Sequence, residues 1–511
     1  MSILYIDLKT GEVRNEKDRD EKGFFLVHSL MGEGSERIVF SSITDASLEI
    51  SGALSSCYAF SSPLKERIEY GYMPSLYGLV LYNFGYTAMV IEGRADCLSY
   101  ITMRGGTVEI HECENYAHTS VSTFSSAVRE KDSDIVIATG KAADSHIKCS
   151  ALYENGKEVG RGGFGYAFSS LNLKGICFQR LLAKRKSGDE DRRYLRALEK
   201  SKFAKRLKRD STTGWIRNAE RAAFLPIDCF ERRHDARAIF LDGSYLKEKY
   251  GVYSAGCGDC PVSCGRLLQD GSSAPDITEA MALGSMQGIF SSDKVMLLKA
   301  AVNEAGLETV EAGAMLAGSS LSFEDKIRFV MDYNGASYGR YEMGGLSVLA
   351  DLRGSGEAAL FLMLGDSELP YYTLYAPCVI RNDRISAILA LFERVYRYAL
   401  SSRGLPVKGA YAAYCSSIPA SCYAVPEILR FVLSRISFFG IKPSLLIKEG
   451  LEIINLIGEE DNPVDDHFVY TSSSTTERSV CNPTRLMMHY RTEKRRLEEK
   501  FLKNTGLGER K

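Results

Sequence analysis

The sequence predicts an α+β protein of several domains, in which a β-rich N-terminal domain precedes two mostly helical domains. The length of 511 residues argues for more than one domain, because single cores stop growing at roughly 250–300 residues. Short β-branched or aromatic runs bounded by Gly, Asp, Asn or Ser fill about the first 180 residues. Beyond them, apolar residues recur at spacings of three and four, which indicates helices. We expect the domains at residues 1–182, 183–360 and 361–511.

The composition excludes several classes of protein. Lys and Arg number 64 and Asp and Glu number 65, and this balance gives no support for a nucleic-acid binder. A hydrophobic share of 45% is typical of globular proteins and argues against disorder over the whole chain. No apolar run reaches the ~18 residues of a membrane helix, and the first twenty residues lack the apolar core of a signal peptide. We therefore expect a cytoplasmic protein without a membrane partner.

The strands are expected in seven segments of the N-terminal domain. Their apolar alternation is imperfect, as in sheets that are covered on both faces. The segments are residues 23–30, 36–43, 46–54, 87–95, 98–110, 133–140 and 173–180.

The helical remainder begins with a segment dense in both signs of charge, Ala183–Asp210. The ordinary interpretation is a solvated helix leading out of the first domain, and a nucleic-acid or membrane surface would need more than one such segment. Further helices are expected within residues 279–322, 384–400, 425–434 and 443–457, with a terminal helix from residue 485.

Cysteine is the unusual component of the composition. The chain holds 13 cysteines, an odd number, and nothing marks it for export, so a disulfide framework is a poor interpretation. Cys257, Cys260 and Cys264 form a C-x2-C-x3-C run, and the Gly and Pro residues around them supply the tight turns that three converging thiolates need. Iron–sulfur clusters take four thiolates, often three of them from one loop. The run therefore indicates a [4Fe–4S] cluster.

Alternatives to the cluster stay open at this point. Zinc also takes four ligands, commonly in two C-x2-C halves or with His, but this chain has no second C-x2-C pair. The three thiols could also be crowded together by chance. Spacing cannot choose a fourth ligand among the N-terminal cysteines and Cys378, Cys415, Cys422 and Cys481.

A glycine-rich segment, Asn155–Gly165, contains the run Gly160, Arg161, Gly162 and Gly163. Glycines let backbone N–H groups approach an anion closely, and a guanidinium can pair with that anion through two hydrogen bonds. The pattern is neither a Walker loop nor a G-x-G-x-x-G fingerprint, so a tight turn between a strand and a helix is the alternative.

In combination these segments resemble the aldehyde:ferredoxin oxidoreductase family, the tungsten or molybdenum pterin enzymes. The resemblance runs over most of residues 1–320 and is faint in the C-terminal third. It implies Cys415 as the fourth cluster ligand, because Gly409–Cys415 stands where the family has a motif that ends in Cys. The segments that carry it are Phe84–Ala95, Val159–Lys174, Leu225–Pro226, Tyr245–Arg266 and Ala305–Gly313.

The resemblance implies an N-terminal domain that cradles a bis-pterin tungsten or molybdenum cofactor beside a [4Fe–4S] cluster. It implies oxidation of an aldehyde to a carboxylic acid, with electrons leaving to ferredoxin or another electron-transfer subunit, and a possible homodimer. Glu279 and Glu308 stand where the family has acidic residues and are the candidates for catalysis. The residues that would bind the pterin cofactor are Gly160, Arg161, Gly162, Gly163, Asn172 and Lys174.

The sequence also departs from the family pattern at pterin-facing positions. Tyr72–Ser75 replaces an Asn-Ala-Gly-Gly turn whose N–H groups bind pterin phosphate, and its proline removes one donor. Ala410 replaces an aspartate, and the block with the active-site histidine is missing, since no His occurs between His234 and His467. These losses motivate a second hypothesis. It is a non-catalytic paralogue without pterin that acts as an electron-transfer or structural subunit beside an active homologue.

Overall fold

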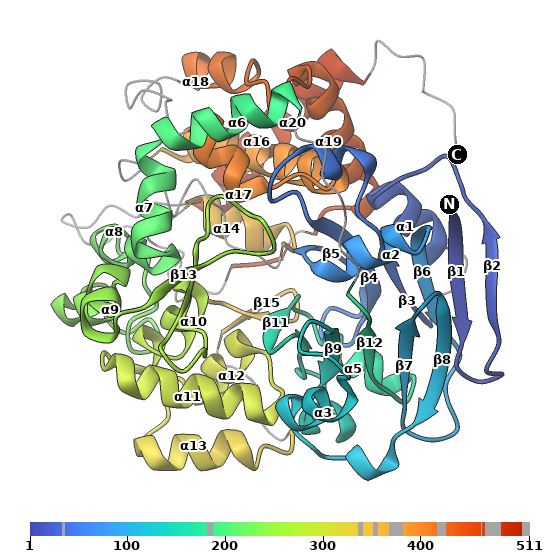
Figure 1. Ribbon diagram of the computed structural model, residues 1–511. Helices are drawn as coiled ribbons and strands as arrows, with labels where there is room; N and C mark the ends of the chain where they lie inside the picture. Colours follow the sequence, from blue (N-terminus) through green and yellow to red (C-terminus); the bar gives the residue numbers. More distant parts are fainter. Residues whose placement is uncertain are drawn as a thin grey trace.

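The structure, a computed structural model, gathers its strands on one side and most of its helices on the other (Figure 1). It describes residues 1–32, 36–180, 188–335, 341–350, 356–366, 382–415, 426–460, 462–464 and 482–502. In this part of the chain no helix is long and apolar enough to span a membrane. The predicted α+β class, β-rich first and helical afterwards, is confirmed.

The first sheet has six strands, in which β1 pairs parallel with β6 and the other neighbours pair antiparallel. Strands β4 (Ser55–Ser62) and β5 (Arg67–Pro74) form a hairpin, which pairs without interruption from Ser55 opposite Pro74 to Ser62 opposite Arg67. In spatial order the strands are β2 (Val13–Lys17), β1 (Ser2–Asp7), β6 (Tyr86–Glu92), β3 (Arg37–Ser41), β4 (Ser55–Ser62) and β5 (Arg67–Pro74).

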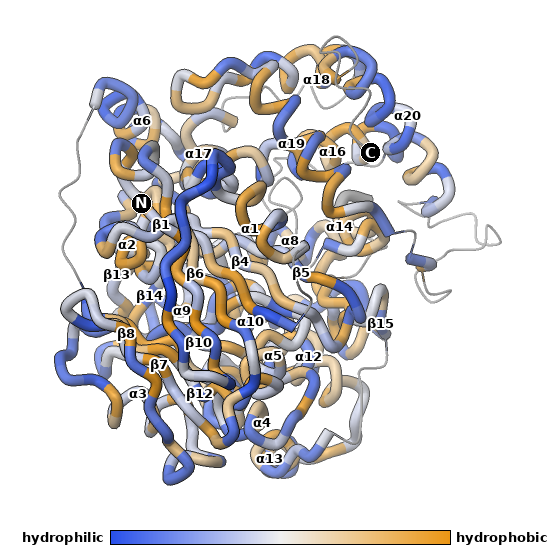
Figure 2. Tube along the Cα trace, turned by 90° about the vertical axis from the view of Figure 1, so that its right-hand side faces the viewer, coloured by the Kyte–Doolittle hydropathy of each residue, from blue (hydrophilic) through white to orange (hydrophobic). Residues whose placement is uncertain are grey.

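The second sheet also has six strands, and its one parallel pair is β12 with β7. In spatial order they are β11 (Lys157–Val159), β10 (Leu152–Glu154), β9 (Ile135–Thr139), β12 (Leu173–Phe178), β7 (Ser99–Arg104) and β8 (Thr107–Glu112). Figure 2 shows apolar residues along the strands inside both sheets. Five short helices accompany the sheets: α1 (Phe24–Met31), α2 (Leu76–Asn83), α3 (Val121–Val128), α4 (Lys141–Asp144) and α5 (Phe164–Ser170).

The helical part also contains two small hairpins, β13 (Tyr253–Ala255) with β14 (Gly265–Leu267) and β15 (Glu342–Met343) with β16 (Leu346–Ser347). Its first helices are α6 (Asp189–Lys200), α7 (Lys202–Asp210), α8 (Ile216–Arg221), α9 (Gly243–Tyr250), α10 (Ile277–Ala282), α11 (Ser292–Ala305), α12 (Thr309–Leu316), α13 (Phe323–Met331) and α14 (Gly356–Met363). The later ones are α16 (Asp383–Ser402), α17 (Val407–Ala410), a π-helical turn η7 (Tyr411–Cys415), α18 (Pro426–Leu433), α19 (Pro443–Ile457) and α20 (Pro483–Phe501).

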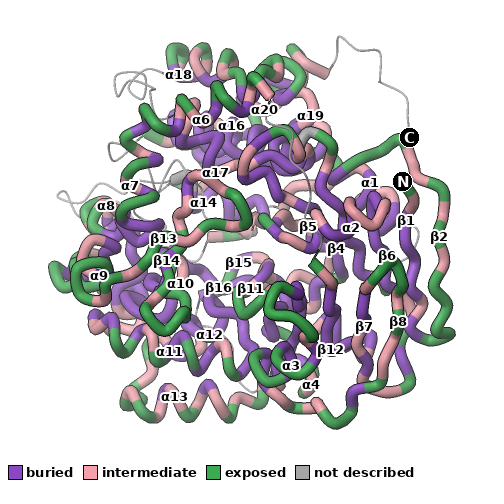
Figure 3. The backbone as a smooth tube through the Cα atoms, in the orientation of Figure 1, coloured by how far each residue is buried: buried purple, intermediate pink, exposed green. Residues whose placement is uncertain are grey.

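Helix α16 is the centre of the C-terminal part, and every residue from Ile385 to Ser402 is buried (Figure 3). Helices α14, α18, α19 and α20 pack against it. The largest hydrophobic cluster contains side chains from all three predicted domains, because α1 and the inner face of the first sheet pack against the helical part. The domain boundaries at residues 182 and 360 stay a prediction.

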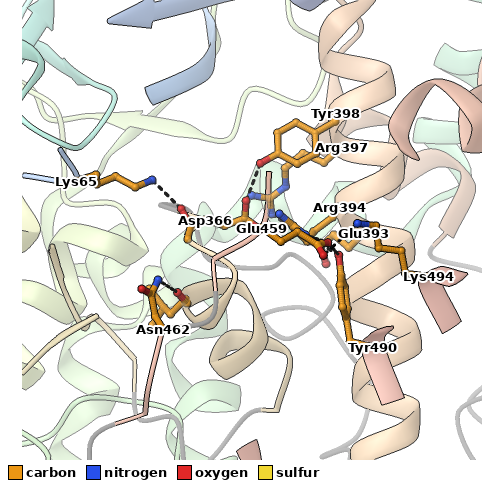
Figure 4. A network of polar contacts seen from close by, with 12 residues as sticks. Lys65, Asp366, Glu393, Arg394, Arg397, Tyr398, Glu459, Asn462, Tyr490 and Lys494 are labelled. Carbon is orange, nitrogen blue, oxygen red and sulfur yellow. Dashed lines mark hydrogen bonds and ion pairs between the residues drawn. The ribbon is translucent and has the colours of Figure 1, made fainter. Parts of the chain in front are cut away.

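A buried polar network fastens the helices around α16 (Figure 4). The Arg394 guanidinium donates to Asp366 after α14 at 2.6 Å, to Glu459 after α19 at 3.2 Å and to Tyr490 of α20 at 2.5 Å. From the strand side, Lys65 donates to the carbonyl of Gly365 at 2.7 Å. The network therefore joins the helices to one another and to the loop between β4 and β5.

Two predicted strands are wrong. Residues 23–30 form helix α1, and residues 46–54 begin with a 3₁₀ helix, η1 (Asp45–Glu49). A short apolar run cannot distinguish a buried helix from a buried strand, so distant packing decides. The N-terminus of α1 sits against the end of α16, where Phe24 N donates to Ser402 Oγ at 3.3 Å and a Cβ on Gly23 would lie 2.0 Å from the Ser402 carbonyl.

The charged segment before residue 210 forms two helices rather than one. Helix α6 ends at Lys200, and the side chain of Ser201 then accepts a hydrogen bond from Ala204 N and so caps α7. The start of the predicted segment, residues 183–187, lies outside the described residues.

Candidate functional site

The three clustered cysteines lie in the loop between β13 and β14. Cys260 N donates to the Cys257 carbonyl at 3.0 Å, which closes the first turn. Burial raises the pKa of the Cys260 thiol, while the N–H groups of Val262 and Ser263 donate to its sulfur and lower that pKa. Donation of N–H groups to thiolate sulfur is one way in which proteins hold and tune iron–sulfur clusters. This donor set therefore fits the predicted cluster.

Arg266 fastens this loop to helix α7. Its side chain is 7% exposed and donates to the carbonyl of Leu207 at 3.2 Å and to that of Lys208. From the segment after α7, Ser211 Oγ donates to the Cys264 carbonyl at 2.7 Å. The arginine that follows the cysteines is thus a buried clamp, which holds the cysteine loop against the C-terminal end of α7.

Cys415, the residue that the resemblance implied as fourth ligand, is buried in the turn η7, which packs against α6 and α7. The ring of Tyr194 on α6 stacks on that of Tyr414 with centroids 6.4 Å apart. Burial raises the pKa of the Tyr194 phenol, and the nearby thiol of Cys260 raises it further. The thiol of Cys415, by contrast, lies near Tyr396 and Tyr411, where burial raises both pKa values and this thiol raises them further. Three other candidates, Cys378, Cys422 and Cys481, lie outside the described residues.

Among the residues described, no group of three or more His, Cys, Asp or Glu side chains is arranged to hold a single metal ion. The three loop cysteines are nonetheless close enough for Cys257 and Cys264 to raise the pKa of the Cys260 thiol. The full ligand set, Cys257, Cys260, Cys264 and Cys415, stays a prediction.

The glycine-rich loop leads from β11 into α5, and two of its donors, Arg161 Nη2 and the Gly163 N–H, are bonded within the chain. Gly163 has a left-handed conformation with φ of 83°, and its N–H donates to Glu308 Oε1 at 2.6 Å. Arg161 donates to Glu311 Oε1 at 2.7 Å and to the Ser347 carbonyl at 3.1 Å. A Cβ on Gly160 would lie 2.5 Å from the Tyr58 hydroxyl, so the loop also packs closely on β4.

Glu308 is fully buried at the start of α12. Burial raises the pKa of its carboxyl well above the usual range, and the neighbouring carboxylates of Glu311 and Glu158 raise it further. Within the described part of the chain, its second oxygen, Oε2, has no hydrogen-bond partner. Burial likewise raises the pKa of Glu158 to about 7, although Thr309 N and Thr309 Oγ1 donate to it at 3.1 and 2.5 Å.

The other predicted residues have separate roles in the fold. Glu279 forms a capping box with Asp276 at the start of α10 and an ion pair with Lys299 at 3.0 Å. Lys174 is fully buried and pairs with Asp144. Asn172 donates to the carbonyl of Ala95 at 2.6 Å. The structure therefore brings Gly163, Arg161 and Glu308 together and holds Lys174 and Asn172 in contacts of the second sheet. Glu279 lies close enough to Glu158 to raise the pKa of that carboxyl group further.

The residues present do not fit a bis-pterin at this loop. The segment Tyr72–Ser75, which replaces the phosphate-binding turn, forms the end of β5 and the N-cap of α2, and the Tyr72 ring lies 6.0 Å from that of Tyr398 on α16. The pocket between the loop after β4 and Glu311 has a volume of about 130 Å³. Pockets for drug-sized ligands measure roughly 300–1,000 Å³, and a bis-pterin is larger than such ligands. Within the described residues, strand β5 and the occupied donors leave this cofactor no cradle.

Sequence reasoning missed two of the residues that engage Arg161. Glu308 is the N-cap residue of α12 and Glu311 lies in its first turn, so the sequence pointed to two acids at the start of one helix. Ser347 in β16 lies 186 positions from Arg161, and nothing in the sequence points to it.

Comparisons with known proteins agree with this fold. The family model described as aldehyde ferredoxin oxidoreductase, N-terminal domain, matches residues 34–180, and the model of domains 2 and 3 of that enzyme matches residues 191–327. Together they cover more than half of the chain. The chain belongs to the aldehyde ferredoxin oxidoreductase family, and the resemblance seen in the sequence is confirmed.

The relatives are distant. The tungsten-containing aldehyde ferredoxin oxidoreductase of Pyrococcus abyssi is 26% identical over 302 residues, which are 56% of this chain and 50% of the relative. The aliphatic sulfonate oxidoreductase, WOR-like subunit, of Pyrococcus furiosus is 23% identical over 61% of this chain and 58% of the relative. The match thus spans about half the length of these curated relatives.

The fold is shared with a solved structure. The active site complex BamBC of benzoyl coenzyme A reductase, in complex with 1,5-dienoyl-CoA, superposes with a TM-score of 0.66. The superposition covers 96% of this chain and 94% of that chain at 12% identity. This likeness extends the shared fold to the C-terminal part, beyond the residues matched by the family models.

Proposed function

We propose that this chain is a pterin-free member of the family, a [4Fe–4S] protein that serves as an electron-transfer or structural subunit. One observation carries the proposal. Two donors of the glycine-rich loop, Arg161 Nη2 and the Gly163 N–H, are engaged by Glu311 and Glu308 of the same chain.

Energetics support this proposal. An incoming pterin phosphate would have to displace the Arg161–Glu311 ion pair, and a hydrogen bond to a charged group contributes roughly 1.5–3 kcal/mol. It would also lie beside the carboxylate of Glu311, where like charge is unfavourable at low dielectric. The missing histidine, and strand β5 in place of the phosphate-binding turn, also support a chain without pterin.

The cysteine loop supports a retained cluster. Its three thiols, the N–H donors to the Cys260 sulfur and the clamp made by Arg266 form a local scaffold that does not depend on pterin. One relative is named a subunit, and this supports a role beside another chain, such as an active homologue, ferredoxin or another electron carrier.

A second candidate function is aldehyde oxidation at a tungsten or molybdenum pterin. The family match and the relatives named as tungsten-containing enzymes favour it. Anaerobic purification followed by elemental analysis for iron, zinc, tungsten and molybdenum separates the two. We expect about four iron atoms per chain, as one [4Fe–4S] cluster requires, without tungsten or molybdenum. Stoichiometric tungsten together with aldehyde-dependent dye reduction would overturn the proposal, and zinc without iron would exclude the cluster.

A further inference from the structure

A concentrated basic surface lies beside the cysteine loop. Residues 200–209 contain six Lys or Arg side chains and no acid, in a chain whose net charge is −1. The exposed lysines of this segment, which we call the basic face, are Lys200, Lys202, Lys205 and Lys208.

The charge of the basic face is not neutralised by neighbouring acids. Arg192 and Arg193 of α6 pair with acids one turn earlier, and Arg209 pairs with Asp210 at 2.6 Å. In the described part of the chain, by contrast, no carboxylate lies within ion-pair distance of the four lysines of the basic face. Unpaired exposed charges of one sign attract a partner of opposite sign and steer its approach.

The cysteine loop is bonded directly to this face. Arg266 donates to the carbonyl of Lys208, and Ser254 Oγ donates to the same carbonyl at 3.5 Å. Figure 1 shows α7 running beside β13, and Figure 3 shows exposed residues along both. The hairpin adds an exposed apolar pair, Tyr253 at 61% and Leu267 at 37%, which lie opposite each other in register.

We propose that the basic face and the Tyr253–Leu267 pair form the docking surface for a small acidic iron–sulfur protein. An apolar centre with a charged rim is the usual anatomy of a transient interface. Cys257, Cys260 and Cys264 would help to hold a cluster in the cysteine loop, and that cluster would exchange one electron with the cluster of the partner. One cluster would be oxidised while the other is reduced, and no bond or proton would be transferred.

Charge complementarity selects a protein over a nucleic acid. A protein surface that binds nucleic acid neutralises many phosphates along an extended path. Here the unpaired charge is confined to one short segment beside an apolar pair. Because the basic face lies beside the cysteine loop, we infer that its acidic partner is an electron carrier. The inference rests on the proposed function, because it requires the cluster.

The test compares two charge-reversal variants of the full chain. One carries Lys200→Glu, Lys202→Glu, Lys205→Glu and Lys208→Glu. The matched control reverses four exposed lysines of the strand part, namely Lys9, Lys17, Lys131 and Lys157, so that the net charge changes equally. The probe is a small acidic [4Fe–4S] ferredoxin, whose binding is measured by calorimetry and whose electron exchange is followed by stopped-flow absorbance.

We expect the basic-face variant to lose about tenfold or more in affinity and in electron-exchange rate, while the control stays near the wild type. Binding to the wild type should weaken as salt is raised. Equal binding by both variants would overturn the docking surface, as would tighter binding of a duplex oligonucleotide than of ferredoxin. If the fourfold variant does not fold, the double variant Lys205→Glu with Lys208→Glu is used, with Lys131→Glu and Lys157→Glu as its control.

The proposed cluster and the docking surface can be tested separately. Purified protein without iron sinks the proposed cluster, and binding that still depends on the basic face would then define a docking surface without electron exchange. A reducible cluster together with binding that ignores the basic face sinks the docking surface alone.

Discussion

Replacing Glu158 by Gln is expected to remove a pH-dependent loss of stability. Glu158 lies in β11, next to the glycine-rich loop, and accepts hydrogen bonds from Thr309 at the start of α12. A Gln side chain has almost the same shape and keeps an acceptor oxygen for Thr309, but it cannot ionise. The variant therefore isolates the charge of this carboxyl group from its packing.

The magnitude follows from the pKa of Glu158, which burial raises from 4.5 to about 7. Since the folded state holds this proton more tightly than the unfolded state, its contribution is complete below pH 4.5 and is lost as the pH rises through 7. A shift of this size corresponds to at most about 3.4 kcal/mol. Glu158 is partly exposed, and solvent screening lowers the expected effect to roughly 1–2 kcal/mol.

The assay is urea unfolding of the wild type and of the Glu158→Gln variant at pH 5 and pH 8. We expect the wild type to lose roughly 1–2 kcal/mol more than the variant between these two values. Glu12→Gln is the control, because this residue is exposed and its replacement should shift both measurements equally. Parallel losses in wild type and Glu158→Gln would refute the reasoning.

Three further predictions concern the cysteine loop and the network around α16. Cys260→Ser should lower the iron content of the purified protein, whereas Cys229→Ser, at a buried cysteine outside the loop, should leave it unchanged. Arg266→Ala removes donors to buried carbonyls, so it should cost roughly 1–3 kcal/mol and speed iron release to a chelator; an unchanged release rate would argue against the clamp. Arg394→Met leaves buried acids unpaired and should cost roughly 3–5 kcal/mol in urea unfolding, while Lys494→Met at the edge of the network costs less than 1 kcal/mol.

Local patterns predicted much of the fold because they reflect local physics. The strand around residues 87–95 and the helix at Pro443–Ile457 follow from apolar runs and periodicity, and the structure has them as β6 and α19. Residues 23–30 carried an equally apolar run and were predicted wrongly. Their helix depends on contact with Ser402, which lies 378 positions from Phe24.

In the candidate site, too, some features follow from local sequence and others depend on distant contacts. The spacing of Cys257, Cys260 and Cys264 places three thiols in one loop whatever the rest of the chain does, so the sequence determined the cluster hypothesis. The sequence also fixed where the chain departs from its family, at Tyr72–Ser75 and at the missing histidine. Only the tertiary structure decided which groups the donors of the glycine-rich loop bind. Arg161 and its carboxylate partner Glu311 lie 150 positions apart, and such a contact depends on how the second sheet packs against α12 rather than on any pattern within either segment.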